Sequence, residues 1–192
     1  MHPSIERVRA ALAAASLDVE VVEFAESTRT AAEAAAAIGT TPARIVKSLV
    51  FLAGHSPVLV LASGANRVDT RKLAAACGQP VKRADAEQAR AATGYVIGGT
   101  PPVGHTHPLP TYVDADLLAY DRVWAAAGTP NAVFAITPVD LVRLTAGRVL
   151  DLRADDEPAG SRQRTSSSSG RRLIRRRTSA GSRPSTRGGR TG

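Results

Sequence analysis

The sequence predicts an α+β fold with a mixed β-sheet, and three observations support this class. Helical and strand-like hydrophobic patterns both occur along the chain. They follow one another without the regular strand–helix–strand alternation of a doubly wound fold. Hydrophobic residues make up 43% of the 192 residues, which is enough to bury the core of one domain. We therefore expect one folded domain over residues 1–154, followed by a tail of different composition.

Local start and stop signals limit the predicted helices. Thr30 and Glu33 have the spacing of a capping box, in which each side chain accepts a hydrogen bond from the other residue's backbone. Glycine ends helices because it adopts left-handed backbone angles easily. The predicted helices are one that carries Ile5, Val8 and Leu12 on one face and ends at Ser16 to Asp18, one from Thr30 to Gly39, a turn opened by Pro42, one from Asp69 or Thr70 to Cys77, one from Asp85 to Thr93, and one opened by Thr137 and Pro138.

Runs rich in β-branched and aliphatic residues predict the strands. The two strongest runs, 45–53 and 58–62, are separated by Gly-His-Ser-Pro and indicate a hairpin. The other predicted strands lie at 19–24, 111–113, 122–126, 132–136 and 148–152.

The net charge of +8 comes from the end of the chain. Residues 1–157 contain 15 Lys and Arg against 17 Asp and Glu, whereas residues 158–192 contain 10 Arg and no acidic residue. The second segment is rich in Ser, Gly and Thr, and its large apolar residues are Leu173 and Ile174. Such a composition cannot bury enough surface to offset its ordering entropy, so we expect a disordered basic tail over residues 155–192. The tail either strengthens binding to nucleic-acid phosphates or has no role.

Several classes of protein are excluded by what the sequence lacks. No run approaches the roughly 18 apolar residues of a membrane span, and the first ten residues do not resemble a secretion signal. Cys77 is the single cysteine, which excludes a disulfide framework. Phosphate-loop, nucleophile-elbow and zinc-deaminase motifs are missing, and His105 and His107 have no evident third metal ligand. We expect a soluble cytoplasmic protein without a metal.

Lys47 lies in a predicted strand on the same face as Ile45, Leu49 and Phe51. Lysine is rarely buried, and an ammonium on an apolar face needs an anionic or carbonyl partner. The alternative is a lysine near the strand end, whose aliphatic stem covers apolar surface while its head stays in water. The pattern fits both interpretations equally.

The segment from Gly98 to His105 is too rich in Gly and Pro for a regular element. The adjacent glycines Gly98 and Gly99 let backbone amides approach a ligand, and Pro101 and Pro102 make the segment rigid. Such a loop suits a preorganised site that donates amide hydrogens to a carbonyl oxygen. A rigid connection between two elements is the other interpretation, and it is the commoner one for such a segment.

Four motifs follow one another in a characteristic order. They are Ile-Val-Lys-Ser-Leu-Val-Phe at 45–51, Gly-Ala-Asn-Arg-Val-Asp-Thr-Arg-Lys-Leu at 64–73, Thr-Gly-Tyr-Val-Ile-Gly-Gly-Thr-Pro-Pro-Val-Gly-His at 93–105, and Ala-Gly-Thr-Pro-Asn-Ala-Val-Phe at 127–134 with Pro-Val-Asp-Leu at 138–141. This order resembles the YbaK/ProX family of aminoacyl-tRNA editing domains, relatives of the insertion domain of bacterial prolyl-tRNA synthetases. The resemblance covers roughly residues 3–152, and the Lys47 strand with the G-x-x-x-P loop from Gly98 to Pro102 is its specific mark.

The resemblance implies a barrel-like mixed sheet flanked by helices and a free-standing deacylase that hydrolyses the ester between a mischarged amino acid and the tRNA 3′ end. Lys47 would lie beside the terminal adenosine, and loop amides, those of Gly98 and Gly99 first, would hold the aminoacyl carbonyl. Water would be the nucleophile, helped by a ribose hydroxyl, and no metal or organic cofactor is implied. The implied partners are the 3′-CCA end of an aminoacyl-tRNA and, as a candidate, an aminoacyl-tRNA synthetase. The other expected substrate contacts are Ser48, Leu49, Thr100, Pro101, Pro102, Val103, Gly104, His105 and Val133.

The sequence does not determine which amino acid such a site removes. An aliphatic Val133 in the pocket wall offers no polar contact to a hydroxyl or thiol, which favours a small apolar amino acid. Apolar pockets discriminate one methylene by only ~1–3 kcal/mol, so this preference is weak. The resemblance implies tRNA for proline as the usual carrier. Two other functions stay open: an inactive tRNA-binding or regulatory module on the same fold, and a nucleic-acid-binding protein that works through its Arg-rich tail.

Overall fold

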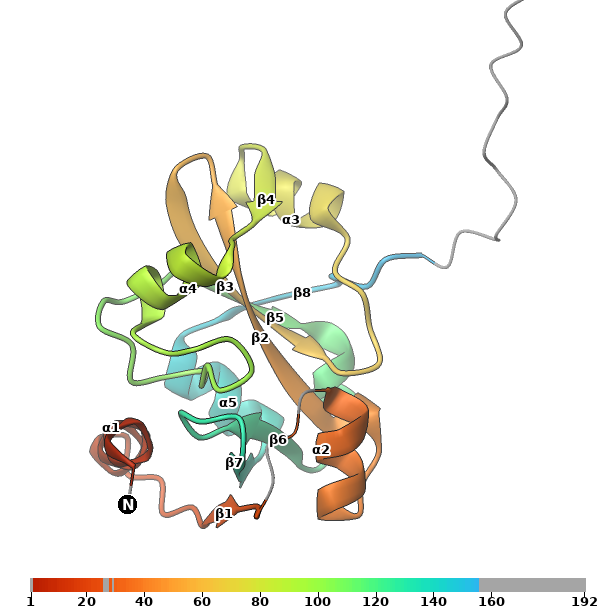
Figure 1. Cartoon of the computed structure of the whole chain (residues 1–192). Helices are drawn as coiled ribbons and strands as arrows, with labels where there is room; N and C mark the ends of the chain where they lie inside the picture. Colours follow the sequence, from red (N-terminus) through yellow and green to blue (C-terminus); the bar gives the residue numbers. More distant parts are fainter. Residues whose placement is uncertain (1, 26–27, 29, 156–192) are drawn as a thin grey trace, which may run out of the picture. The chain divides into compact units, whose positions relative to one another are not determined.

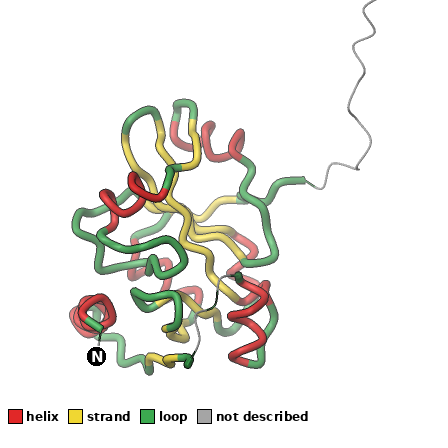
Figure 2. The backbone as a smooth tube through the Cα atoms, in the orientation of Figure 1, coloured by secondary structure: helices red, strands yellow, loops and turns green. Residues whose placement is uncertain are grey.

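The computed structural model describes residues 2–25, 28 and 30–155, and the structural statements below concern them. Figure 2 shows helices lying around a central sheet. The helices are α1 (Pro3–Ala14), α2 (Ala31–Ile38), α3 (Thr70–Cys77), α4 (Ala86–Thr93) and α5 (Pro138–Thr145), with 3₁₀ turns η1 (Pro42–Arg44) and η2 (Ala115–Ala119). The strands are β1 (Val21–Glu23), β2 (Ile45–Ala53), β3 (Ser56–Ser63), β4 (Val81–Arg83), β5 (Thr111–Asp114), β6 (Val123–Ala126), β7 (Ala132–Ile136) and β8 (Arg148–Leu150). Apart from Asp155, the predicted tail at 155–192 lies outside the described residues.

The strands form one mixed sheet of eight strands within the described part of the chain, in the order β1-β7-β6-β2-β3-β5-β8, with β4 also paired to β2. The β2–β3 hairpin is antiparallel, whereas β2 pairs in parallel with β6 and β3 in parallel with β5. Figure 1 shows β2 as a long curved strand that runs from the side of α2 to the side of β4. The predicted α+β class with a mixed sheet flanked by helices is confirmed.

Local signals place the helix ends as predicted. In α2 the Thr30 hydroxyl accepts from the Glu33 amide at 3.1 Å and the Glu33 carboxylate accepts from the Thr30 amide at 3.3 Å, so the capping box is complete. Asp85 and Gln88 form a second capping box on α4. Gly39, with φ of 76°, takes the left-handed conformation that ends α2.

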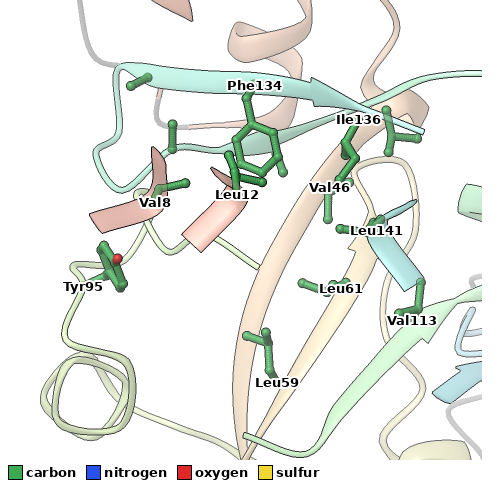
Figure 3. Packing of buried hydrophobic residues seen from close by; sticks show 14 of the residues in the cluster. Val8, Leu12, Val46, Leu59, Leu61, Tyr95, Val113, Phe134, Ile136 and Leu141 are labelled. Carbon is green, nitrogen blue, oxygen red and sulfur yellow. The ribbon is translucent and has the colours of Figure 1, made fainter. Parts of the chain in front are cut away.

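The sheet is buried on both faces. Alternate residues of β3 illustrate this, since Leu59 and Leu61 pack into the main core while Val60 packs into a second cluster with Leu73 of α3. The main core gathers side chains from α1, α4, α5 and six strands, and Figure 3 shows Val8 and Leu12 of α1 close to Phe134 of β7. Burial on both faces explains why β2 and β3 are almost continuously apolar.

Two elements were not predicted from the sequence. Strand β4 has three residues, and it is a strand because it pairs with Phe51, Leu52 and Ala53 of β2 rather than because of its own pattern. The turn η2 follows β5 directly and is capped by Asp114. The predicted strand at 19–24 is shortened to β1, and the one at 148–152 to β8. No helix among the described residues is both long and apolar enough to span a membrane.

Candidate active site

The candidate site is a cavity of about 540 Å³ that opens where β2 lacks a neighbour on one edge. On this edge β6 pairs with Ile45 and Val46, and β4 pairs with residues 51–53. Between them no described strand pairs with residues 47–49, so β6 and β4 form a fork with the middle of β2 at its base. All residues from Ile45 to Val50 line the cavity. The fork explains how residues from both faces of one strand reach the same space.

Lys47 lies at the base of this fork, and its side chain is partly buried. Its ammonium donates a hydrogen bond of 2.5 Å to the backbone carbonyl of Asn66, which follows β3. A carbonyl is one of the two kinds of partner, anionic or carbonyl, that we expected for a lysine on an apolar face. Burial lowers the pKa of Lys47, the charge of Arg83 lowers it further, and the charge of Asp114 acts in the opposite direction.

Arg83 gives the cavity a second positive charge. It is the last residue of β4, lines the cavity, and lies over the Phe51 ring at 5.6 Å from the ring centre. Among the described residues neither Lys47 nor Arg83 has a carboxylate within ion-pair distance. Two cations without an acidic partner make the cavity a place for an anion or for an oxygen on which negative charge develops.

The opposite wall includes part of the Gly98 loop, the name used here for residues 95–105. The amide of Gly99 donates to the Val96 carbonyl at 3.1 Å, and the Thr100 hydroxyl donates to the same carbonyl at 3.2 Å. These two bonds form a tight turn. Within the described residues the amides of Gly98 and Thr100 have no acceptor, and both residues line the cavity. They are the candidate donors of this wall.

The far end of the Gly98 loop folds back on itself and onto α1. His105 Nε2 bonds the Pro101 carbonyl at 2.8 Å, and the Tyr95 hydroxyl donates to the Gly104 carbonyl at 2.8 Å. The Arg7 guanidinium of α1 lies 4.4 Å from the centre of the Tyr95 ring. Burial lowers the pKa of His105, with a smaller opposing effect from the bond to Pro101. These contacts hold the loop in one shape.

The structure divides the predicted site residues into two groups. Lys47, Ser48, Leu49, Gly98, Thr100 and Val133 line the cavity. Six others do not line it: Gly99, Pro101, Pro102, Val103, Gly104 and His105.

Gly99 makes contacts that the sequence did not indicate. Its amide is already bonded within the loop, and a Cβ on it would lie 2.7 Å from the Thr129 Cα and 3.0 Å from the Pro130 nitrogen. Gly99 is therefore required for close packing of the loop on the neighbouring turn, and its amide is not free to hold a carbonyl. His105 likewise shapes the loop instead of facing the cavity.

Sequence reasoning missed several lining residues because their place at the cavity depends on how distant segments pack together. Thr28, Arg83, Trp124, Thr129 and Pro130 belong to this group. Two hydroxyls in the lining residues, Ser48 Oγ and Thr129 Oγ1, are buried without a partner in the described part of the chain. The wall around Val133 is therefore less uniformly apolar than the sequence indicated. Thr129 and Pro130 belong to the 127–134 motif, and their backbone packs closely against Gly99.

A metal site would require several ligating side chains close together. Across residues 2–25, 28 and 30–155, no three His, Cys, Asp or Glu side chains gather in a way that could hold a metal ion. His105 is bonded to Pro101, and His107 is exposed. The lining of the cavity offers the cations of Lys47 and Arg83 together with hydroxyl-bearing residues and backbone amides.

Comparison with known proteins places this fold and cavity in a family. The model of the aminoacyl-tRNA editing domain matches residues 25–144, which include β2, the Gly98 loop and β7. The chain belongs to the aminoacyl-tRNA editing domain family.

Three relatives illustrate the range of similarity. YwhH of Bacillus subtilis (strain 168), which is described as uncharacterized, is 30% identical over 147 residues, which cover 76% of this chain and 94% of that protein. EbsC of Enterococcus faecalis (strain ATCC 700802 / V583), described as a "putative Cys-tRNA(Pro)/Cys-tRNA(Cys) deacylase", is 30% identical over 134 residues, or 68% of this chain and 82% of that one. A crystal structure described as "a putative trans-editing enzyme for prolyl tRNA synthetase" has 48% identity and a TM-score of 0.77, and the match covers 81% of this chain and 99% of that chain.

Proposed function

We propose that the protein is a trans-editing aminoacyl-tRNA deacylase, a hydrolase that cleaves the ester between a wrongly attached amino acid and the tRNA 3′ end. The observation that carries this proposal is the cavity, where Lys47 faces the same space as the amide-bearing residues Gly98 and Thr100. Family membership supports it, and so does the size of the cavity, which is in the range that holds a small ligand such as a terminal aminoacyl-adenosine.

In the proposed reaction water attacks the ester carbonyl carbon, and the bond from this carbon to the ribose oxygen breaks. The proton released by water passes to the ribose oxygen, so that the products are the free amino acid and the tRNA. A ribose hydroxyl of the substrate orients the water. Negative charge grows on the carbonyl oxygen in the transition state, and each fixed donor at this oxygen contributes ~3–4 kcal/mol. Lys47 as an ammonium, together with the Gly98 and Thr100 amides, supplies such donors.

Arg83 has a separate role in this proposal. A guanidinium at the mouth of a cavity binds phosphate well because its donors match the phosphate oxygens in pairs. We assign it to a phosphate of the single-stranded 3′-CCA end, which is the part of the tRNA that such a cavity admits. Such a substrate places the enzyme in the cytoplasm, where an aminoacyl-tRNA synthetase is a candidate partner.

For the substrate we propose tRNA for proline that carries a small non-cognate amino acid. The support comes from relatives whose descriptions refer to prolyl-tRNA synthetase and to Cys-tRNA(Pro). Val133 contributes an apolar side chain to the cavity lining, which also includes the hydroxyl-bearing residues Ser48 and Thr129. Alanine, cysteine and serine are the amino acids to compare.

A deacylation panel tests this proposal. Wild-type protein is incubated with tRNA for proline that carries alanine, cysteine, serine or proline. Tests with tRNA for alanine that carries its cognate alanine are run beside them. The loss of the labelled amino acid from each tRNA is followed. We expect rapid loss of one small non-cognate amino acid and slow loss of proline. Binding of these tRNAs without any hydrolysis above the uncatalysed rate would instead identify an inactive tRNA-binding module.

A further inference from the structure

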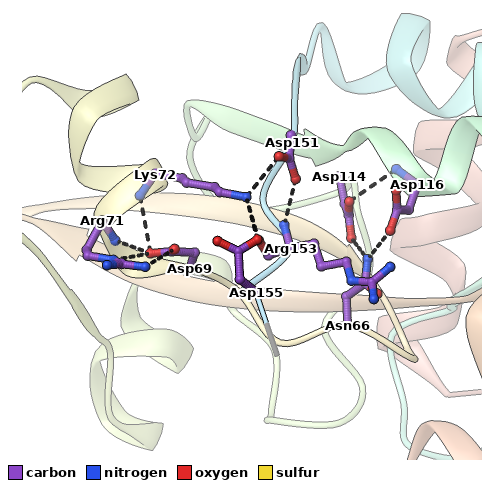
Figure 4. A network of polar contacts seen from close by, with 9 residues as sticks. All are labelled: Asn66, Asp69, Arg71, Lys72, Asp114, Asp116, Asp151, Arg153 and Asp155. Carbon is purple, nitrogen blue, oxygen red and sulfur yellow. Dashed lines mark hydrogen bonds and ion pairs between the residues drawn. The ribbon is translucent and has the colours of Figure 1, made fainter. Parts of the chain in front are cut away.

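The partner of Lys47 is a backbone carbonyl, and a backbone carbonyl exists whatever the side chain at that position. What distinguishes residue 66 is how firmly its side chain is held. Asn66 is 8% exposed, and its side-chain nitrogen donates to the carboxylates of Asp114 and Asp116, each at 2.8 Å. Figure 4 shows both bonds converging on this nitrogen. An amide nitrogen has two hydrogens, so these two bonds fix the orientation of the side chain.

Asp114 is itself anchored to the sheet. It is the last residue of β5 and 1% exposed, and its carboxylate accepts from the Ser63 amide at 3.1 Å and from the Asp116 amide at 3.2 Å. Because β5 pairs with β3, this carboxylate moves with the strand that is paired to β2. The Asn66 side chain is thus fixed relative to the same sheet that carries Lys47.

These bonds are not needed merely to attach the segment to the domain. The segment after Asn66 is already tied to the end of the described chain, because the Asp69 amide donates to the Leu152 carbonyl and the Ala154 amide donates to the Arg67 carbonyl, each at 2.8 Å. Lys72 adds an ion pair with Asp151 at 2.8 Å, which Figure 4 also shows. The Asn66 bonds therefore act locally, on the residue whose carbonyl meets the lysine.

The choice of a neutral amide also has an electrostatic effect. An arginine or lysine at position 66 would neutralise Asp114, whereas Asn66 satisfies its hydrogen bonds and leaves its charge in place. The Asp114 charge raises the pKa of Lys47 against the lowering effects of burial and of Arg83. The same cluster that fixes the carbonyl thus also favours the ammonium form of the lysine.

We propose that Asn66, held by Asp114 and Asp116, is a positioning residue that sets the place of the Lys47 ammonium in the cavity. This inference rests on the proposed function, because the value of a fixed ammonium is the hydrolysis that it assists. Asn66 does not line the cavity, so it acts through Lys47 and not on the substrate. Small displacements of a catalytic group lower the rate strongly.

A double-mutant cycle tests the proposal with Asn66→Ala, Lys47→Ala and the double variant, all assayed on the preferred tRNA. In the wild-type background we expect Asn66→Ala to lower kcat on the order of tenfold. In the Lys47→Ala background the same change should lower kcat less than twofold, since the residue that Asn66 positions is gone. Equal effects in both backgrounds would show a role that does not pass through Lys47 and would overturn the proposal. Asp140→Asn is the matched control. Asp140, like Asn66, takes part in two side-chain hydrogen bonds and does not line the cavity, and we expect wild-type activity from this variant.

A second measurement does not depend on hydrolysis. The ammonium of Lys47, held at 2.5 Å from a carbonyl, should give a slowly exchanging side-chain NMR signal at low temperature, assigned by its loss in Lys47→Ala. We expect this signal to broaden or disappear in Asn66→Ala and in Asp114→Asn. The second variant keeps the size of the side chain at position 114, and it serves as the test if Asn66→Ala does not fold. An unchanged signal in a folded variant would overturn the proposal. If the wild type hydrolyses no mischarged tRNA, the proposed function fails, while this signal still decides the positioning role.

Discussion

The two walls of the cavity are built in different ways. The β2 wall consists of a strand paired with β3 from Val46 to Ala53, and it presents side chains, above all Lys47. The Gly98 loop has no strand partner, and it presents backbone amides from Gly98 and Thr100. The strand is kept in place by a ladder of backbone bonds. The loop is kept in place by a few side-chain bonds, such as that of Tyr95 to Gly104.

The groups that face the cavity are therefore held in two different ways, a side chain by its hydrogen-bond acceptor and the backbone amides by the fixed loop. A long side chain with a charged end needs an acceptor that fixes the end, and Lys47 finds it in the carbonyl of Asn66. A backbone amide needs instead a fixed backbone, which the loop obtains from Gly99, His105 and Tyr95. Substitutions in the strand wall should therefore change the rate first, and substitutions in the loop supports should change stability first.

The largest expected effect comes from the strand wall. Lys47→Ala removes the ammonium that faces the cavity, and we expect kcat/KM for deacylation to fall on the order of a hundredfold or more. Single-turnover deacylation measures this fall, and circular dichroism checks that the domain is folded. Lys82→Ala is the matched control, since Lys82 is an exposed lysine of β4 that does not line the cavity. Wild-type activity in a folded Lys47→Ala protein would remove Lys47 from the mechanism.

A second pair of variants separates support from chemistry within the loop. Gly99→Ala places a Cβ against backbone atoms of Thr129 and Pro130 at 2.7–3.0 Å, and we expect it to lower the free energy of unfolding by about 1–3 kcal/mol. Gly98→Ala places a Cβ in ordinary contact with Pro130 at 3.9 Å, but φ at Gly98 is 87°, which strains the backbone of an alanine and displaces the amide. We expect Gly98→Ala to reduce turnover per folded molecule more than Gly99→Ala does. Denaturant unfolding and deacylation of the same preparations give both quantities, and the reverse order would contradict this assignment.

A third prediction concerns pH and the support from His105. Burial lowers the pKa of His105 in the folded chain, so the unfolded chain binds more protons as the pH falls below the ordinary histidine value of about 6.5. The stability that neutral His105 provides is present above this pH and is lost as the pH falls through the folded pKa. We expect the free energy of unfolding to decrease by up to about 1.4 kcal/mol per pH unit in this window, and the decrease to be smaller in His105→Gln.

His55→Gln serves as its control, because His55 is exposed in the β2–β3 turn. Urea unfolding between pH 7 and about pH 5 measures the slope for the three proteins. The prediction fails if His55→Gln flattens the curve as much as His105→Gln.

The smallest expected effect lies outside both walls. Truncation after Glu157 removes a segment with ten Arg and no acidic residue. If these arginines contact tRNA phosphates, KM should rise and kcat should stay the same. The log–log slope of affinity against salt should decrease by ~0.7–0.9 for each lost contact. Steady-state kinetics at several salt concentrations gives both values, and identical constants for the full-length and truncated chains would leave the tail without a role in binding.

An element could be predicted from the sequence where the residues that determine it are neighbours in the chain. The capping box of Thr30 and Glu33 and the stop at Gly39 involve neighbours in the chain, and α2 was predicted correctly from them. The three residues of β4 are too few for a periodic pattern, and their strand conformation depends on pairing with β2. Arg83 was therefore missed, because its place in the cavity follows from that pairing.

The same distinction applies within the site. Lys47 could be identified because a lysine among aliphatic residues is unusual in itself, and its need for a partner is a local argument. The identity of that partner is not local, since Asn66 reaches Lys47 only through the fold. The contacts that Gly99 and His105 make within the loop were not predicted, for a related reason. Residue types in a Gly- and Pro-rich loop show that the loop is special, but not which of its groups are already bonded within it.

The fork in the sheet has a thermodynamic consequence. Over residues 47–49, β2 has no described strand neighbour on the edge between β6 and β4. Backbone groups that are withdrawn from water without a partner cost about 1–3 kcal/mol each. A ligand that bonds them binds the folded chain and not the unfolded one, and it raises the free energy of unfolding by RT ln(1 + [L]/Kd). A rise in melting temperature therefore reports a ligand that binds at this open edge of β2.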